Sequence, residues 1–108
     1  MRTKRSLSQA FVRKISNMPE LQHGAVRIAL WLVSAAEQKG GFPVEAFAPS
    51  SFIAGLNDDG IRVPGIQFRP ETVHKSLESL ESCGLLTIET GLLVRGGRTA
   101  KLFTLHLD

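Results

Sequence analysis

A pair of glycines near the C-terminus places the tightest constraint on the fold. In the segment GLLVRGGRTAKLFTL (91–105), Gly96-Gly97 has an arginine on each side and apolar residues beyond. A Gly-Gly pair favours a two-residue hairpin turn, because the central residues of such turns adopt positive φ angles. The segment therefore predicts an antiparallel hairpin in which Arg95 pairs with Arg98.

Counting back from that turn gives a predicted register for the two strands. The expected pairs are Val94 with Thr99, Leu92 with Lys101, Thr90 with Phe103, Ile88 with Leu105 and Leu86 with Leu107. Towards the base this face is apolar, while the other face carries polar pairs such as Thr87 with His106. Such alternation is typical of an antiparallel pair that covers a core on one side.

The segment before the hairpin, RPETVHKSLESLESCGLL (69–86), has strong helix signals. Pro70 suits the first turn, Glu71 suits the positive N-terminal end, and Gly84 suits the stop. The residues predicted to face the core are Val73, Leu77 and Leu80, with Cys83 at its border as a small buried hydrophobe. The opposite face carries Thr72, Lys75, Ser76 and Ser79. It has no large apolar residue, so it is left for a partner or for solvent.

Earlier segments predict further helices and little strand. Residues 6–18 predict a helix with one apolar stripe, formed by Leu7, Phe11, Ile15 and Met18. Residues 24–41 are apolar on nearly every side and predict a central buried helix that stops at Gly40-Gly41. Residues 42–47 suggest a short extended segment, 49–57 a short helix, and 58–67 a loop. The fold class expected is mainly α with a small antiparallel β hairpin, that is, α+β.

Composition limits the classes of protein that the chain can belong to. Its 108 residues suit a single domain (1–108), and its net charge is +3 with basic residues gathered at the N-terminus and the hairpin tip. No apolar run is long enough for a membrane span, and the N-terminus lacks the pattern of a signal peptide. A single cysteine excludes an internal disulfide and fits a reducing, cytoplasmic location.

No pattern typical of an enzyme occurs in the chain. A phosphate loop and a nucleophile elbow are both missing, and His23, His74 and His106 lack metal-ligand spacing. We therefore expect no catalysis, no metal, no cofactor and no small-molecule substrate.

The order of helix, helix, short strand, helix, helix and hairpin resembles winged helix-turn-helix DNA-binding domains. The segment FRPETVHKSLESLESCGLL followed by a hairpin carries the resemblance, which covers residues 24–107. Small bacterial repressors and plasmid replication or partition regulators use this fold. The resemblance implies that helix 69–83 reads the major groove of double-stranded DNA. It also implies that the wing tip, 95–98, contacts the backbone or the minor groove.

Positions carried over from the family give the expected DNA-binding residues. On the helix these are Arg69, Thr72, His74, Lys75 and Ser76, and on the wing they are Arg95, Gly96, Gly97 and Arg98. The segment 57–67 is longer than the usual turn between the two helices. Either the second helix continues into it, or it is an inserted loop, in which case Arg62 is an additional candidate. Arg5 belongs to a basic N-terminal arm and helix (1–18), in which the arm is either a minor-groove contact or a tail.

The resemblance further implies a regulator of the bacterial cytoplasm or nucleoid, acting as a transcriptional repressor or in plasmid partition or replication. A homodimer is expected, with the apolar stripe of 6–18 as its contact and two recognition helices about 34 Å apart. One alternative is a winged helix that serves as a protein–protein interaction module. Another is binding of RNA or single-stranded nucleic acid, which the small number of aromatic residues disfavours.

Overall fold

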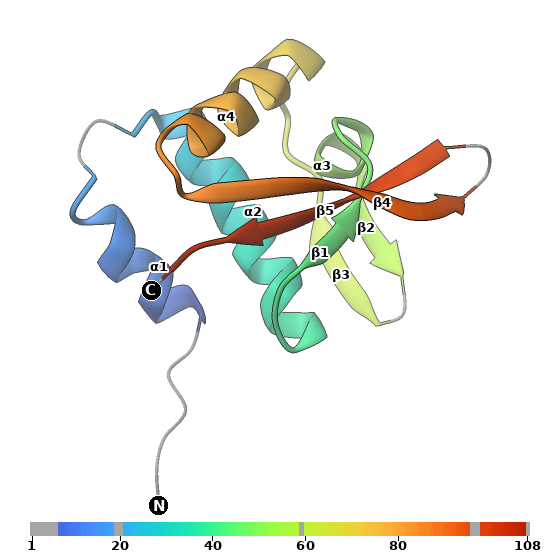
Figure 1. Cartoon of the computed structure of the whole chain (residues 1–108), viewed down its shortest axis with the longest axis horizontal. Helices are drawn as coiled ribbons and strands as arrows, with labels where there is room; N and C mark the ends of the chain where they lie inside the picture. The colour runs from blue at the N-terminus through green and yellow to red at the C-terminus, as the bar shows by residue number, and fades with distance from the viewer. Residues whose placement is uncertain (1–6, 19–20, 59, 96–97, 108) are drawn as a thin grey trace, which may run out of the picture.

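Helices and strands follow one another along the chain as Figure 1 shows. The computed structural model describes residues 7–18, 21–58, 60–95 and 98–107, and for 58, 91–95 and 98–99 it describes the backbone alone. Its helices are α1 (Leu7–Ile15), α2 (His23–Lys39), α3 (Ser50–Ala54) and α4 (Pro70–Ser82). Its strands are β1 (Val44–Ala46), β2 (Gly55–Asp58), β3 (Ile61–Pro64), β4 (Leu86–Arg95) and β5 (Arg98–Leu105). The expected α+β class is confirmed.

The helix α2 forms the centre of the core, as its apolar sequence predicted. The ring of Trp31 packs against Phe52 of α3, with the two ring centroids 4.5 Å apart. Phe52 in turn meets Phe103 of β5 edge-on at 5.4 Å, so that helices and sheet share one core. The helix ends at Gly40, which adopts the left-handed conformation (φ 103°) that favours glycine at this position.

The helix α1 packs against α2 within the chain, where the sequence predicted an exposed apolar stripe. The apolar stripe of α1 and the turn after it consists of Leu7, Phe11, Ile15 and Met18. Phe11 is only 2% exposed, and the other three are partly buried against the same core. The Ser8 hydroxyl also donates a hydrogen bond to Glu37 Oε1 of α2 at 2.6 Å. Phe11, at the centre of the stripe, is therefore covered by this chain's own residues, while the homodimer stays a prediction.

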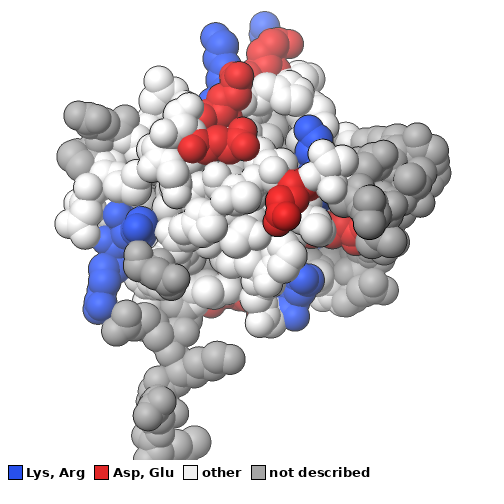
Figure 2. Space-filling model, viewed as in Figure 1, with Lys and Arg blue, Asp and Glu red and all other residues white. Residues whose placement is uncertain are grey.

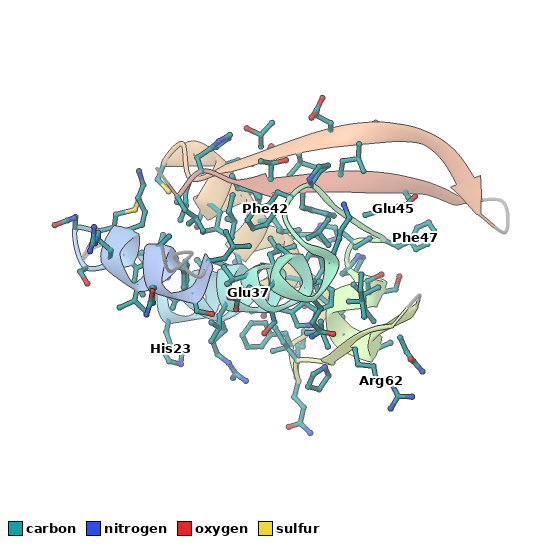
Figure 3. The ribbon with its side chains drawn as sticks, turned by 90° about the horizontal axis from the view of Figure 1, so that it is seen from below. His23, Glu37, Phe42, Glu45, Phe47 and Arg62 are labelled. Carbon is teal, nitrogen blue, oxygen red and sulfur yellow. The ribbon has the colours of Figure 1, made fainter. Side chains whose placement is uncertain are left out.

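A three-stranded antiparallel sheet in the order β1–β5–β4 forms a layer separate from α2 (Figure 3). The short strand β1 pairs with β5, with Val44 opposite Phe103. Beyond β1, the β4–β5 hairpin continues as a two-stranded ribbon past the helices (Figure 1). At its outer end Arg95 lies opposite Arg98, as predicted.

The register of the lower half of this hairpin differs from the prediction. Between Thr90 and Val94 the pairing shifts, so that Thr90 rather than Leu92 lies opposite Lys101. Leu86 consequently pairs with Leu105, and the expected register there is wrong by two residues. Because the error is an even number, the side chains of 86–90 and 101–105 keep their predicted faces. The apolar face therefore still covers the core.

The segment between α3 and α4 forms a second hairpin, β2–β3, where the sequence predicted the end of a helix and a loop. Gly55 pairs with Pro64 and Leu56 with Val63, so the helix expected over 49–57 stops at Ala54. Gly55 has a φ of 93°, which ends the helix. Leu56 and Val63 pack against the core, which favours strands over a solvated loop.

Contacts with α2 fix the position of this second hairpin. The Gln38 side chain binds both backbone groups of Arg62. It accepts a hydrogen bond from the Arg62 N–H at 2.6 Å and donates one to the Arg62 carbonyl at 2.8 Å. The Trp31 indole N–H donates to the Pro64 carbonyl at 3.0 Å. The β2–β3 hairpin is therefore an integral part of the domain.

Candidate nucleic-acid interface

The helix α4 begins one residue after and ends one residue before the predicted range of 69–83. Pro70 opens the first turn after Arg69, which is extended, and Glu71 lies near the positive end of the helix dipole. Gly84 follows the helix with a φ of 79°, a conformation that favours glycine. The predicted inner residues Val73, Leu77 and Leu80 are all buried.

Four of the five candidates on this helix are exposed. They are Arg69, Thr72, His74 and Lys75. They occupy the residue before the helix and its first two turns, so the N-terminal half of α4 is accessible to a partner. Their contact with DNA stays a prediction.

The fifth candidate, Ser76, is buried, and the prediction that it faces a partner is wrong. It is 5% exposed, and its hydroxyl lies 3.1 Å from the place where a Cβ on Gly24 of α2 would be. The reason is helical spacing, because position 76 follows Val73 by three residues and precedes Leu80 by four. Ser76 is therefore a small residue at which α4 packs closely against α2.

The exposed surface of α4 carries more acid than base. Glu71, Glu78 and Glu81 are exposed beside a single lysine, Lys75. Figure 2 shows acidic and basic side chains mixed over the end of the molecule where α4 lies. Phosphates repel carboxylates, and two of the three, Glu78 and Glu81, lie in the second half of the helix. The N-terminal half carries Glu71 beside Lys75 and follows Arg69, so it is the half that suits a polyanion better.

The candidates at the wing lie at the outer end of the β4–β5 hairpin. Arg95 ends β4 and Arg98 begins β5, at the point of the ribbon farthest from the helices (Figure 1). Gly96, Gly97 and Arg5 lie outside the described residues. The paired backbone of Arg95 and Arg98 fits the predicted turn, and their contact with DNA stays a prediction.

Arg62 lies on β3, where its side chain is exposed. Figure 3 shows it pointing outward on the side of the molecule away from the β4–β5 hairpin. The structure therefore does not bring Arg62 together with the wing. Gln38 fixes its backbone, so the position of its Cα is well defined relative to α2.

Cys83 is exposed, which corrects the expectation of a small buried hydrophobe. It caps the C-terminal end of α4, one step beyond the helix, and its thiol lies 3.4 Å from the Leu80 carbonyl. It also borders a groove of about 840 Å³ between the end of α1 and α4, with Met18, Leu21 and Lys75 among the other lining residues. Among the described residues, no group of three His, Cys, Asp or Glu side chains is arranged to hold a metal ion.

Sequence reasoning missed one arrangement beside α4. The Arg27 guanidinium carbon lies 5.2 Å from the centroid of the Phe68 ring, in cation–π contact. Arg27 belongs to the exposed stripe of α2, with His23 one turn before it. The sequence predicted a buried helix over 24–41 and did not indicate that Arg27 contacts the residue before Arg69.

In comparisons with known proteins, no family model, curated protein or solved structure matches the chain. No helix in the described part of the chain is long and apolar enough to cross a bilayer. The functional argument therefore depends on the residues and their geometry.

Proposed function

We propose that the chain binds double-stranded DNA with α4 and the β4–β5 hairpin, in the manner of a winged helix-turn-helix domain. The observation that carries the proposal is the accessible N-terminal half of α4 beside a hairpin that extends beyond the helices. The order α2, β1, α3, α4, β4, β5 and the strand order β1–β5–β4 support it. The β2–β3 hairpin between α3 and α4 is then an insertion in that fold.

In this proposal α4 enters the major groove with its N-terminal end first. The groove is wide enough to admit a helix, and the base edges there offer distinct donors and acceptors. Thr72 and Lys75 are exposed on this end and suit base contacts, while Arg69 suits a phosphate. Glu78 and Glu81 lie farther along the helix, where a tilted entry keeps them away from the phosphates.

The biological role that fits such a domain is regulation of transcription, as a repressor, or of plasmid partition or replication. A homodimer is part of the proposal, and its contact cannot include Phe11, which is buried within the chain. Selection of bound fragments from genomic and plasmid DNA would identify the target and separate these roles.

The direct test is fluorescence anisotropy of the purified chain with labelled duplex DNA of random sequence at about 50 mM salt. We expect binding that weakens steeply with salt, because the interaction releases counterions from phosphates. A single strand of the same length serves as the comparison. Lack of duplex binding at low salt, or a preference for the single strand, would contradict the proposal.

Base reading by α4 makes a separate prediction for Lys75→Ala. Loss of one direct base contact is expected to weaken a selected site by about 1–3 kcal/mol and random duplex much less. Affinities of both duplexes are measured at one salt concentration. Equal losses on the two duplexes would assign Lys75 to the backbone instead.

A second candidate function is docking on another protein through α4 and the hairpin. The observation that favours it is the excess of exposed carboxylates on α4, which suits a basic protein surface better than a phosphate backbone. The same anisotropy experiment separates the two functions, since a protein-docking module has no salt-dependent affinity for duplex DNA.

A further inference from the structure

The contact between Arg27 and Phe68 lies beside the candidate recognition helix. Arg27 is exposed on α2, and its guanidinium lies over the Phe68 ring at 5.2 Å. Phe68 directly precedes Arg69, which is the extended residue before α4. The contact therefore joins the N-terminal part of α2 to the start of α4.

Backbone contacts and close packing fix the position of the Phe68 ring. Its N–H donates to the Ile66 carbonyl at 2.8 Å, and the Ile66 N–H donates to the Phe52 carbonyl of α3 at 2.8 Å. A Cβ on Gly24, three residues before Arg27, would lie 3.9 Å from the ring. This is an ordinary van der Waals distance, so the ring lies in contact with α2 at the turn that precedes Arg27.

This geometry leaves the hydrogen-bonding groups of Arg27 available. The contact is made with the π-face of the ring, which accepts no conventional hydrogen bond, so the N–H donors of the guanidinium stay available to an anion. No described carboxylate forms an ion pair with Arg27. An arginine whose orientation is already fixed loses less side-chain entropy when it binds an anion. The arrangement fits a phosphate oxygen.

We propose that Arg27 and Phe68 form a phosphate clamp, in which Phe68 orients Arg27 towards the DNA backbone. The inference rests on the proposed function, because it needs α4 in the major groove. A helix in that groove lies between two backbones. The β4–β5 hairpin and α2 belong to separate layers of the domain (Figure 3), so the clamp binds one backbone and the hairpin the other.

The test compares three variants by anisotropy over a range of salt concentrations. Arg27→Ala is expected to lower the slope of log affinity against log salt by about 0.9 and to weaken binding roughly five- to tenfold at 0.1 M salt. Phe68→Leu keeps the charge and loses the ring, so it is expected to weaken binding roughly two- to fivefold with the slope unchanged. The matched control is Arg13→Ala, which removes an exposed arginine of α1 near the C-terminal end of α4.

The outcomes separate the clamp from the proposed function. Normal binding by the unchanged chain with affinity and slope unaffected in Arg27→Ala would overturn the clamp alone. Equal losses in Arg13→Ala and Arg27→Ala would also overturn it, since net charge would then explain both. Lack of duplex binding by the unchanged chain would overturn the proposed function and the clamp together. Thermal unfolding of each variant tests whether it is folded. Arg27→Lys keeps the charge and loses the planar guanidinium, so it is expected to retain the slope and to bind more weakly.

Discussion

At the scale of single residues, helical spacing decides which polar side chains of α4 reach the surface. Thr72 and Ser76 are both small hydroxyl residues four positions apart, yet one is exposed and the other buried. The difference follows from the position of Val73 and Leu80, which place residue 76 on the inner stripe. A stricter count of the helical period would have found this from sequence. The partner at Gly24 lies far away in the chain and had no local signal.

The contrast between Thr72 and Ser76 allows a prediction about stability. Ser76→Leu is expected to destabilise the fold by about 1–3 kcal/mol, because a larger side chain has to displace α4 from α2 near Gly24. Thr72→Leu on the exposed side is expected to change the free energy of unfolding by no more than about 0.5 kcal/mol. Urea unfolding measures both. Equal effects of the two substitutions would place residue 76 at the surface.

At the scale of elements, the sequence correctly predicted the helices and the hairpin that have a proline or a glycine at their ends. Proline and glycine mark the two ends of α4, Gly40 ends α2, and Arg95 lies opposite Arg98 as the Gly-Gly pair between them predicted. The β2–β3 hairpin escaped prediction because its strands are four residues each and depend on contacts with α2, such as that of Gln38. The register shift in β4 escaped because counting pairs from a turn assumes an uninterrupted ladder.

Gly65 lies in the connection after β3, and its close packing allows a prediction about stability. A Cβ at this position would lie 2.0 Å from the Ile53 carbonyl oxygen, a backbone atom that cannot rotate away. Gly65→Ala is therefore expected to destabilise the domain by about 3 kcal/mol. Gly60→Ala is the control, because its φ of 83° costs about 1–2 kcal/mol while its Cβ meets open space. Thermal or urea unfolding that ranks Gly60→Ala as the more damaging change would contradict this close approach.

Arg95 and Arg98, at the outer end of the β4–β5 hairpin, allow a prediction about DNA binding. If Arg95 and Arg98 each contact one phosphate, Arg95→Ala with Arg98→Ala is expected to flatten the salt slope by about two at most for each chain. Binding to all duplexes is expected to weaken alike, while stability changes by no more than about 0.5 kcal/mol. Lys39→Ala, at the end of α2, controls for loss of charge. An unchanged slope and affinity in the double variant would favour the protein-docking function.

At the scale of the whole molecule, α1 packs on the domain core. The sequence predicted a winged-helix core of residues 24–107, with the N-terminal arm and helix of residues 1–18 outside it. Instead Phe11 is among the most buried side chains, and the Ser8 hydroxyl donates a hydrogen bond to Glu37 near the C-terminal end of α2. A periodic apolar stripe predicts burial, but it does not tell whether the covering surface belongs to the same chain. That distinction depends on the tertiary arrangement.

The burial of the Phe11 ring of α1 allows a prediction about stability when this ring is truncated. Phe11→Ala is expected to destabilise the domain by about 3–5 kcal/mol, because it opens a cavity between α1 and α2. Val12→Ala, at the neighbouring position that is 58% exposed, is expected to change stability by no more than about 0.5 kcal/mol. Because Phe11 is covered within one chain, the loss in Phe11→Ala is expected to be independent of protein concentration in urea unfolding. A loss that grows on dilution, together with a lower mass in light scattering, would show that residue 11 is buried between two chains.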